Sequence, residues 1–73
     1  MNDKRRFVML QRRYREKWDA YQIIAHKNAQ LVQAGRQPSN GQLIDEQDAA
    51  LAVELARDEL RRVIAALGAG NAA

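Results

Sequence analysis

Few side chains in this chain could carry out covalent chemistry, and the sequence does not place them together. There is one serine, Ser39, and one histidine, His26, and the chain has neither cysteine nor threonine. Nucleophilic catalysis needs a nucleophile beside a base that a third group orients. Ser39 lies in a predicted turn, whereas His26 lies on the polar side of a predicted helix and has no thiolate neighbour with which to bind zinc. We therefore expect no enzyme activity, no metal site and no cofactor.

The residues best suited to binding lie near the N-terminus, where basic, aromatic and thioether side chains are interleaved. Residues 1–17 carry a net charge of +5 and residues 42–60 a net charge of −5, although the whole chain carries only +3. Aromatic and Met side chains flanked by Arg are typical of the energetic centres of protein interfaces. We expect a partner-binding surface built from six of these residues: Arg5, Arg6, Phe7, Met9, Leu10 and Arg13.

The basic residues of this segment have two further explanations. Some of them can form ion pairs with acidic residues of the second half of the chain, namely Arg12, Arg13 and Arg15 with Asp58 and Glu59. Alternatively, a basic helix face can contact the phosphates of RNA or DNA. The acidic second half, and the lack of a helix-turn-helix, zinc-finger or basic-zipper signature, make nucleic acid the second hypothesis.

Two predicted helices must position these residues. From about residue 3 to residue 34 the chain contains no proline or glycine. Apolar residues recur there in steps that match the helical period, and they are Phe7, Leu10, Tyr14, Trp18, Tyr21, Ala25 and Val32. Asn28 lies on the same face, where a single buried Asn can fix the register or the oligomeric state of packed helices.

Residues 35–41 interrupt the pattern with the only proline and two of the four glycines. Gly35 suits the left-handed conformation that closes a helix, and Pro38 cannot continue one. Ser39, followed three residues later by Gln42, matches a capping box, although Asn40 could cap the second helix equally well. We expect this helix over about residues 42–67, with Gly68 as its stop and residues 68–73 as a flexible tail.

A connection this short makes the two helices antiparallel neighbours. With the turn centred near residue 38, Tyr21 faces Ala56, Ala25 faces Ala52, and Asn28 faces Ala49. The larger side chains of the first helix, such as Tyr21, thus face small ones of the second, as close packing requires. Phe7 then faces only the tail. Residues 7–10 are therefore expected to overhang the hairpin.

Apolar side chains cover more of each helix than one contact between two helices can use. The core face of the second helix consists of Ala49, Ala52, Val53, Ala56, Leu60, Val63, Ile64 and Leu67. Besides the core faces there are side stripes, whose members are Ile24, Leu31, Ile44, Leu51 and Leu55. In a four-helix bundle each helix touches two neighbours and uses this wider arc. We expect two hairpins to pair through these stripes into a dimeric four-helix bundle, because two-fold pairs are the commonest closed assemblies. The alternative is that one hairpin docks on helices of another protein.

The sequence thus predicts a single all-α domain over residues 1–73, with no membrane span and, given the lack of cysteine, a cytoplasmic location. In size and hairpin plan it resembles plasmid copy-number regulators that dimerise and bind RNA hairpins, small type III secretion chaperones, and helical antiactivators. The resemblance implies a small binding protein and carries no functional residue over. We expect a protein–protein interaction module, with a nucleic-acid-binding dimer and a purely structural assembly element as the competing hypotheses.

Overall fold

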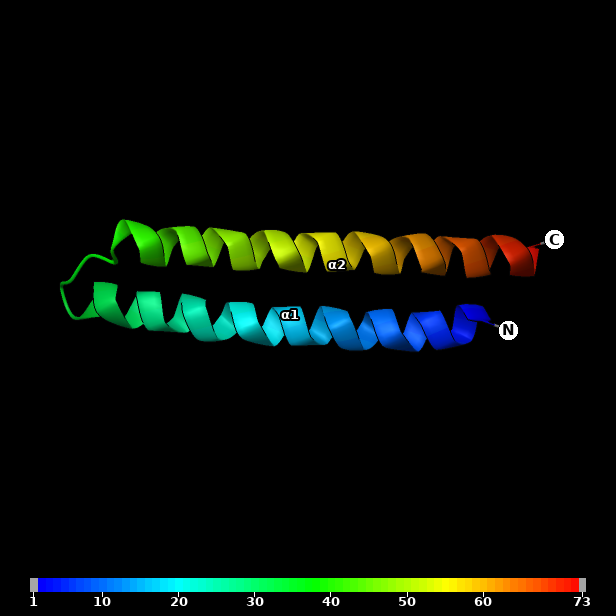
Figure 1. Cartoon of the computed structure of the whole chain (residues 1–73), viewed down its shortest axis with the longest axis horizontal. Helices are drawn as coiled ribbons and strands as arrows, with labels where there is room; N and C mark the ends of the chain where they lie inside the picture. Colours follow the sequence, from blue (N-terminus) through cyan, green and yellow to red (C-terminus); the bar gives the residue numbers. More distant parts are fainter. Residues whose placement is uncertain (1, 73) are drawn as a thin grey trace.

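A computed structural model of the chain describes the backbone of residues 2–72 and the side chains of residues 3–68. Helix α1 spans Asn2–Gln33 and helix α2 spans Asn40–Ala72. They lie side by side and antiparallel, so both ends of the chain lie at one end of a rod that measures 56 × 17 × 14 Å (Figure 1). The predicted all-α hairpin is confirmed. We call the end that carries the chain termini the terminal end, and the other the turn end.

Helix α1 ends where it does because Gly35 adopts a φ of 77°. The Gly35 N–H donates to the Val32 carbonyl oxygen at 3.0 Å, and the Arg36 N–H donates to the Leu31 carbonyl oxygen at 2.8 Å. These two bonds form a Schellman motif, which satisfies carbonyl groups that lose their partners at a helix end. The predicted role of Gly35 is confirmed.

Helix α2 begins with a capping box. The Gln42 N–H donates to Ser39 Oγ at 3.1 Å, and the Ser39 N–H donates to Gln42 Oε1 at 2.8 Å. The Leu43 N–H then donates to the Ser39 carbonyl oxygen at 3.0 Å. Ser39 is therefore the capping residue, and Asn40 is already the first residue of the helix.

Helix α2 is longer than predicted. We expected it to end before Gly68, but it continues to Ala72 and includes most of the predicted tail. A glycine inside a helix costs only about 1 kcal/mol relative to alanine, so it ends a helix only where the chain also turns away, as it does at Gly35. The additional turn of α2 lies opposite the start of α1. Consequently the predicted overhang is wrong, since Phe7 is half-buried and Leu10 is buried.

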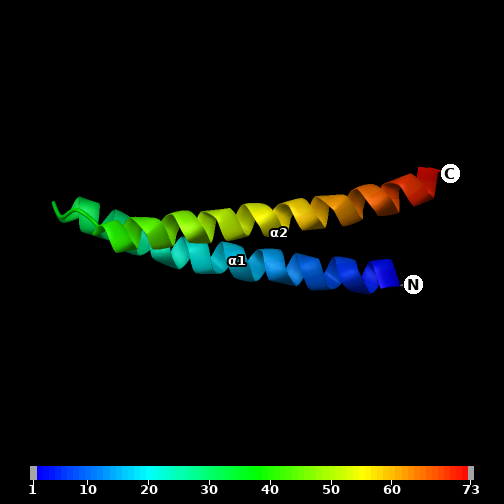
Figure 2. The ribbon, with the colours of Figure 1, turned by 45° about the horizontal axis from the view of Figure 1, so that its top comes forward.

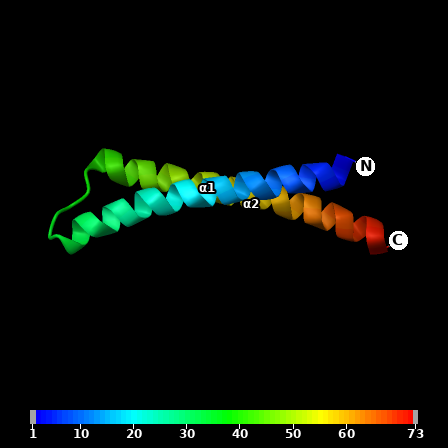
Figure 3. The same ribbon diagram turned by 90° about the horizontal axis from the view of Figure 1, so that it is seen from below.

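The two helices meet along a seam that follows a seven-residue repeat. Its members are buried or half-buried, apart from Lys17, which is exposed: Phe7, Leu10, Tyr14, Lys17, Tyr21, Ile24, Asn28 and Leu31 of α1, and Glu46, Ala49, Val53, Ala56, Leu60, Val63 and Leu67 of α2. Alternating steps of three and four residues give 3.5 residues per turn, so the helices wind around each other. The ribbons accordingly part toward the termini in Figure 2 and cross near their middles in Figure 3.

This repeat corrects the predicted core. Trp18, Val32 and Ile64 fall on a stripe with 3.6 residues per turn, but they lie outside the seam and are exposed. Over several turns the two periods drift apart by about 20° per seven residues. Residues at the margins of the predicted face therefore come to lie beside the seam rather than in it.

Polar contacts between the helices define their register. Asn28 is buried, and its Nδ2 donates to the Gln42 carbonyl oxygen at 3.2 Å and to Glu46 Oε1 at 2.9 Å. Asn28 thus lies opposite Gln42 and Glu46, not opposite Ala49 as predicted. The shift is about one helical turn, and it arises because α1 ends at Gln33 and α2 begins at Asn40, which centres the turn between residues 36 and 37.

Substitution of two glycines by alanine should change stability in opposite directions. Gly35→Ala should lower the free energy of unfolding by about 1–2 kcal/mol, because alanine is strained at positive φ. Gly68→Ala should raise it by about 0.5–1 kcal/mol, because the new methyl group lies within a helix. An added Cβ meets nothing within 4 Å at either site, so the backbone alone sets the sign. Urea denaturation at one fixed protein concentration measures both, and equal shifts would contradict the two roles.

Candidate functional site

The seam divides the surface of the hairpin into two flanks of different chemistry. On one side lie residues that directly precede every second seam position, such as Tyr14 and Val53. We call six of them the charged flank: Arg13, Ala20, Lys27, Asp45, Ala52 and Glu59. Arg13 Nη1 lies 3.6 Å from Glu59 Oε2. Lys27 and Asp45 line one shallow depression. Cations of α1 therefore lie beside acids of α2 on this flank, and the predicted pairing of Arg13 with Glu59 is confirmed.

On the other side lie residues that directly follow the alternate seam positions, such as Lys17 and Ala49, together with Leu43, which lies seven residues before Ala50. Most residues at this spacing are apolar. We call them the apolar flank: Trp18, Ala25, Val32, Leu43, Ala50 and Ile64. The four large side chains among them are between 41% and 61% exposed. The Trp18 ring stacks on Tyr21, with ring centroids 5.6 Å apart. Tyr21 also lines a shallow depression with Leu43 and Ala50 of α2, so the apolar surface runs from one helix to the other.

The predicted self-association residues are divided between three places. Ile24 and Leu31 are half-buried in the seam. Ile44 is exposed and lines the same depression as Tyr21, beside the apolar flank. Leu51 and Leu55 are exposed on the outer face of α2. Leu51 lies two residues, or about 200° around the helix axis, from the seam residues on either side of it.

The predicted partner-binding residues are likewise separated. Phe7 and Leu10 belong to the seam, and Arg13 belongs to the charged flank, where it pairs with Glu59. These three side chains therefore contribute to holding the hairpin together. The remaining three, Arg5, Arg6 and Met9, are exposed.

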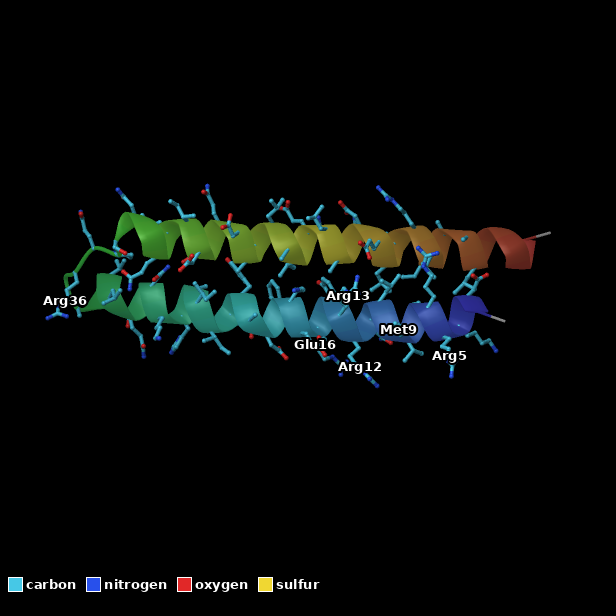
Figure 4. All side chains as sticks on the ribbon, in the orientation of Figure 1. Arg5, Met9, Arg12, Arg13, Glu16 and Arg36 are labelled. Carbon is cyan, nitrogen blue, oxygen red and sulfur yellow. The ribbon has the colours of Figure 1, made fainter. Side chains whose placement is uncertain are left out.

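Two of the exposed residues lie together on the outer face of α1. Figure 4 shows that Arg5, Met9, Arg12 and Glu16 all point away from α2. Met9 is 62% exposed, and it lies between the two arginines along the helix. We call Arg5, Met9 and Arg12 the outer basic face. Arg5 and Met9 belong to the predicted partner-binding surface, whereas Arg12 was not predicted to be part of it; the exposed Arg6 lies outside this face.

The fold also gives one half of the rod a net positive charge and the other half a net negative charge. The terminal half, residues 2–17 of α1 and 56–72 of α2, contains ten of the twelve Lys and Arg residues and four acidic residues, a net side-chain charge of +6. The turn half, residues 18–55, contains two basic and five acidic residues, a net charge of −3. The sequence suggested a basic first helix and an acidic second helix. In the structure the division runs between the two ends instead, because α2 carries its acids toward the turn and its arginines toward the terminal end.

The apolar flank was missed from the sequence. Trp18, Val32 and Ile64 were assigned to the core, and Leu43 to no surface. The spacing of these residues could have revealed the apolar flank. Trp18, Ala25 and Val32 recur every seven residues. Leu43, Ala50 and Ile64 follow the same spacing, with Arg57 at the position between Ala50 and Ile64. Such a repeat keeps a constant angle to a seam with 3.5 residues per turn.

Other features of the described surface hold less chemistry. Among residues 2–72 no group of three or more His, Cys, Asp and Glu side chains is placed to hold a metal ion. His26 is exposed and lines an open depression with Trp18 and Ile23 that lies on α1 alone. Over the same residues, neither helix has a stretch long and apolar enough to cross a bilayer.

The chain matches no protein-family model, and no curated protein or solved structure is significantly similar to it.

Adjacent residues of α1 should respond very differently to truncation. Leu10 is 7% exposed, so Leu10→Ala should lower the free energy of unfolding by about 2–4 kcal/mol through lost burial and a new cavity. Met9→Ala, on the outer basic face, should change it by less than about 0.5 kcal/mol. Urea denaturation followed by circular dichroism measures both values. A small effect at Leu10 would show that residues 7–10 are free of α2 after all.

Proposed function

We propose that this protein is a non-catalytic interaction module, a helical hairpin that self-associates through its apolar flank and binds a partner protein through exposed helix surface. Its role would be that of an adaptor, a chaperone or an inhibitor. The observation that carries the proposal is the amount of surface that the hairpin leaves uncovered.

The hairpin exposes far more surface than a compact protein of its mass. Its accessible surface is 6102 Å², whereas a compact monomer of 8.3 kDa exposes about 4,600 Å². Its radius of gyration is 16.6 Å, against about 11 Å for a compact chain of this length. The difference in surface, about 1,500 Å², exceeds the ~800 Å² that each partner buries in an interface of standard size. The surplus therefore supports docking on another helical surface.

The core of a lone hairpin is small. Among the described residues only four apolar side chains are buried, Leu10, Val53, Ala56 and Val63, and none is less than 2% exposed. Below about 80 residues, a single core rarely supplies more than ~3–5 kcal/mol. Association stabilises a folded state by mass action. This supports a protein whose working form is an assembly.

The apolar flank suits self-association better than the outer face of α2. It takes large side chains from both helices, so a second hairpin seated there would give each helix a second neighbour, as in a four-helix bundle. Leu51 and Leu55 lie on α2 alone and would give only one helix a new neighbour. Ile44 lies beside the flank and would join the contact.

The outer basic face is the surface that we assign to the partner protein. Its methionine is flexible and fills irregular apolar gaps, and arginine is enriched at interface cores. Charge on either side of Met9 would speed the encounter with an acidic partner. A helix presented in this way fits an apolar groove on the partner.

Two matched double variants test where the hairpin self-associates. Leu43→Glu with Ile64→Glu places two charges on the apolar flank, whereas Leu51→Glu with Leu55→Glu places the same two charges on the outer face of the same helix. All four side chains are about half exposed, between 49% and 57%, so both variants should stay helical by circular dichroism. Sedimentation equilibrium should give a dimer for the parent chain and the outer-face variant, and a monomer for the flank variant.

The single tryptophan supplies a second reading of the same experiment. Trp18 belongs to the apolar flank, so its emission should shift to shorter wavelength as the parent chain is concentrated, and should not shift for the flank variant. A parent chain that stays monomeric at millimolar concentration would contradict the proposal. Loss of the dimer in the outer-face variant alone would move the contact to Leu51 and Leu55.

Nucleic-acid binding is the second candidate function, and the charge of the terminal half favours it. Ten basic residues gather there from both helices, and most of the acidic residues that weighed against this function lie elsewhere. Cations along a helix face bind phosphates with an affinity that falls log-linearly with salt.

Salt dependence separates the two functions. Fluorescence anisotropy with an RNA hairpin and a DNA duplex, each titrated at several salt concentrations, should show no binding near physiological salt if the partner is a protein. Tight binding would favour nucleic acid, and Arg5→Gln with Arg12→Gln should then lower the salt slope by about 2, one per lost phosphate contact.

A further inference from the structure

The hairpin is a rod with opposite charges at its two halves. Its terminal half carries a net side-chain charge of +6 and its turn half −3. Lys17 is the one basic residue of the terminal half that occupies a seam position. The other basic side chains there lie outside the seam, and one of them, Arg13, forms an ion pair with Glu59. Lys4, Arg5 and Arg6 oppose the dipole of α1 at its N-terminus, so the helix itself gains nothing from them. A second body with the reverse order of charge would complement this rod.

Two pairs of apolar residues on the apolar flank are placed symmetrically along the rod. On α2 the flank positions 43, 50, 57 and 64 are centred between residues 53 and 54, with Leu43 and Ile64 equally far from the centre. On α1 the corresponding positions 11, 18, 25 and 32 are centred between residues 21 and 22, with Trp18 and Ala25 equally far from it. A two-fold axis through this centre would set Leu43 against the partner copy's position 64, and Trp18 against its position 25. Large side chains would meet apolar neighbours at both places.

We propose that the apolar flank is occupied by a second copy of this chain lying antiparallel, with the terminal end of each hairpin beside the turn end of the other. The inference rests on the self-association proposed above and specifies its geometry. The contact is isologous, because the same flank is used by both copies. In this arrangement the terminal half of each hairpin, with a charge of +6, lies beside the turn half of the other, with a charge of −3, so the two copies attract each other at both ends.

The parallel alternative is disfavoured by the same charges. A two-fold axis along the rod would place both turns at one end and both terminal halves together. Ten basic residues of one copy would then lie beside ten of the other. Like charges held side by side disfavour a pairing and thereby specify the partner orientation.

A spin label at the turn distinguishes the two arrangements. The chain has no cysteine, so Gln37→Cys gives a single labelling site on an exposed, uncharged residue of the turn. In the antiparallel dimer, double electron–electron resonance should give a label separation close to the 56 Å length of the rod. In the parallel dimer, the labels would lie about 20 Å apart, or two helix diameters.

A label at the middle of the rod is the matched control. Ala20→Cys lies on the charged flank, away from the proposed contact and close to the two-fold centre. Its separation should be nearly the same in both arrangements, so it reports that a dimer is present without reporting its direction.

Ionic strength gives an independent readout. In the antiparallel dimer added salt screens an attraction between the ends, so the dissociation constant should rise, whereas in a parallel dimer salt would relieve repulsion and lower it. A separation near 20 Å from position 37, or a dimer that tightens with salt, overturns the antiparallel geometry and leaves self-association standing. No dipolar signal from either label, with a monomer by sedimentation, overturns self-association itself.

Discussion

Two helices that meet along a single seam can each bury only one stripe of side chains, and this limit governs the surface of the hairpin. The seam here follows a seven-residue repeat, in which Leu10, Val53, Ala56 and Val63 are buried and most other members are half-buried. No third element covers the sides within residues 2–72. The apolar residues beside the seam therefore stay exposed, and the hairpin presents about 1,500 Å² more surface than a compact chain of its mass.

The charged flank and the apolar flank differ in whether the hairpin itself supplies partners for their side chains. On the charged flank, cations of α1 lie beside acids of α2 within the hairpin, as the ion pair of Arg13 with Glu59 shows. On the apolar flank, Trp18, Val32, Leu43 and Ile64 extend outward from both helices, and water is their neighbour in the lone hairpin. A charged pair can be satisfied across two helices, but an apolar side chain beside a seam is covered only by a further body. This asymmetry is the physical basis for proposing a binding protein.

The helix ends at the turn and the polar groups in the seam together set the register of the hairpin. An apolar seam with a regular repeat tolerates slippage by whole turns, because each step brings similar side chains together. Asn28 removes this freedom, since its buried amide reaches the Gln42 carbonyl and the Glu46 carboxylate in one register only. The register in turn sets the length of α2 that faces α1, the position of Leu10 in the core, and the gathering of ten basic residues in the terminal half.

The sequence by itself determined the two helices and the helix ends that flank the turn. Helical periodicity, the left-handed glycine at position 35 and the reciprocal cap of Ser39 and Gln42 are local features, fixed by residues within a few positions of each other. Only the tertiary structure decided which apolar residues lie in the seam and where charge gathers. Trp18 and Val32 lie outside the seam, Leu10 is buried against α2 rather than overhanging it, and α2 continues past Gly68. These outcomes depend on supercoiling and on a register that involves residues far apart in the chain.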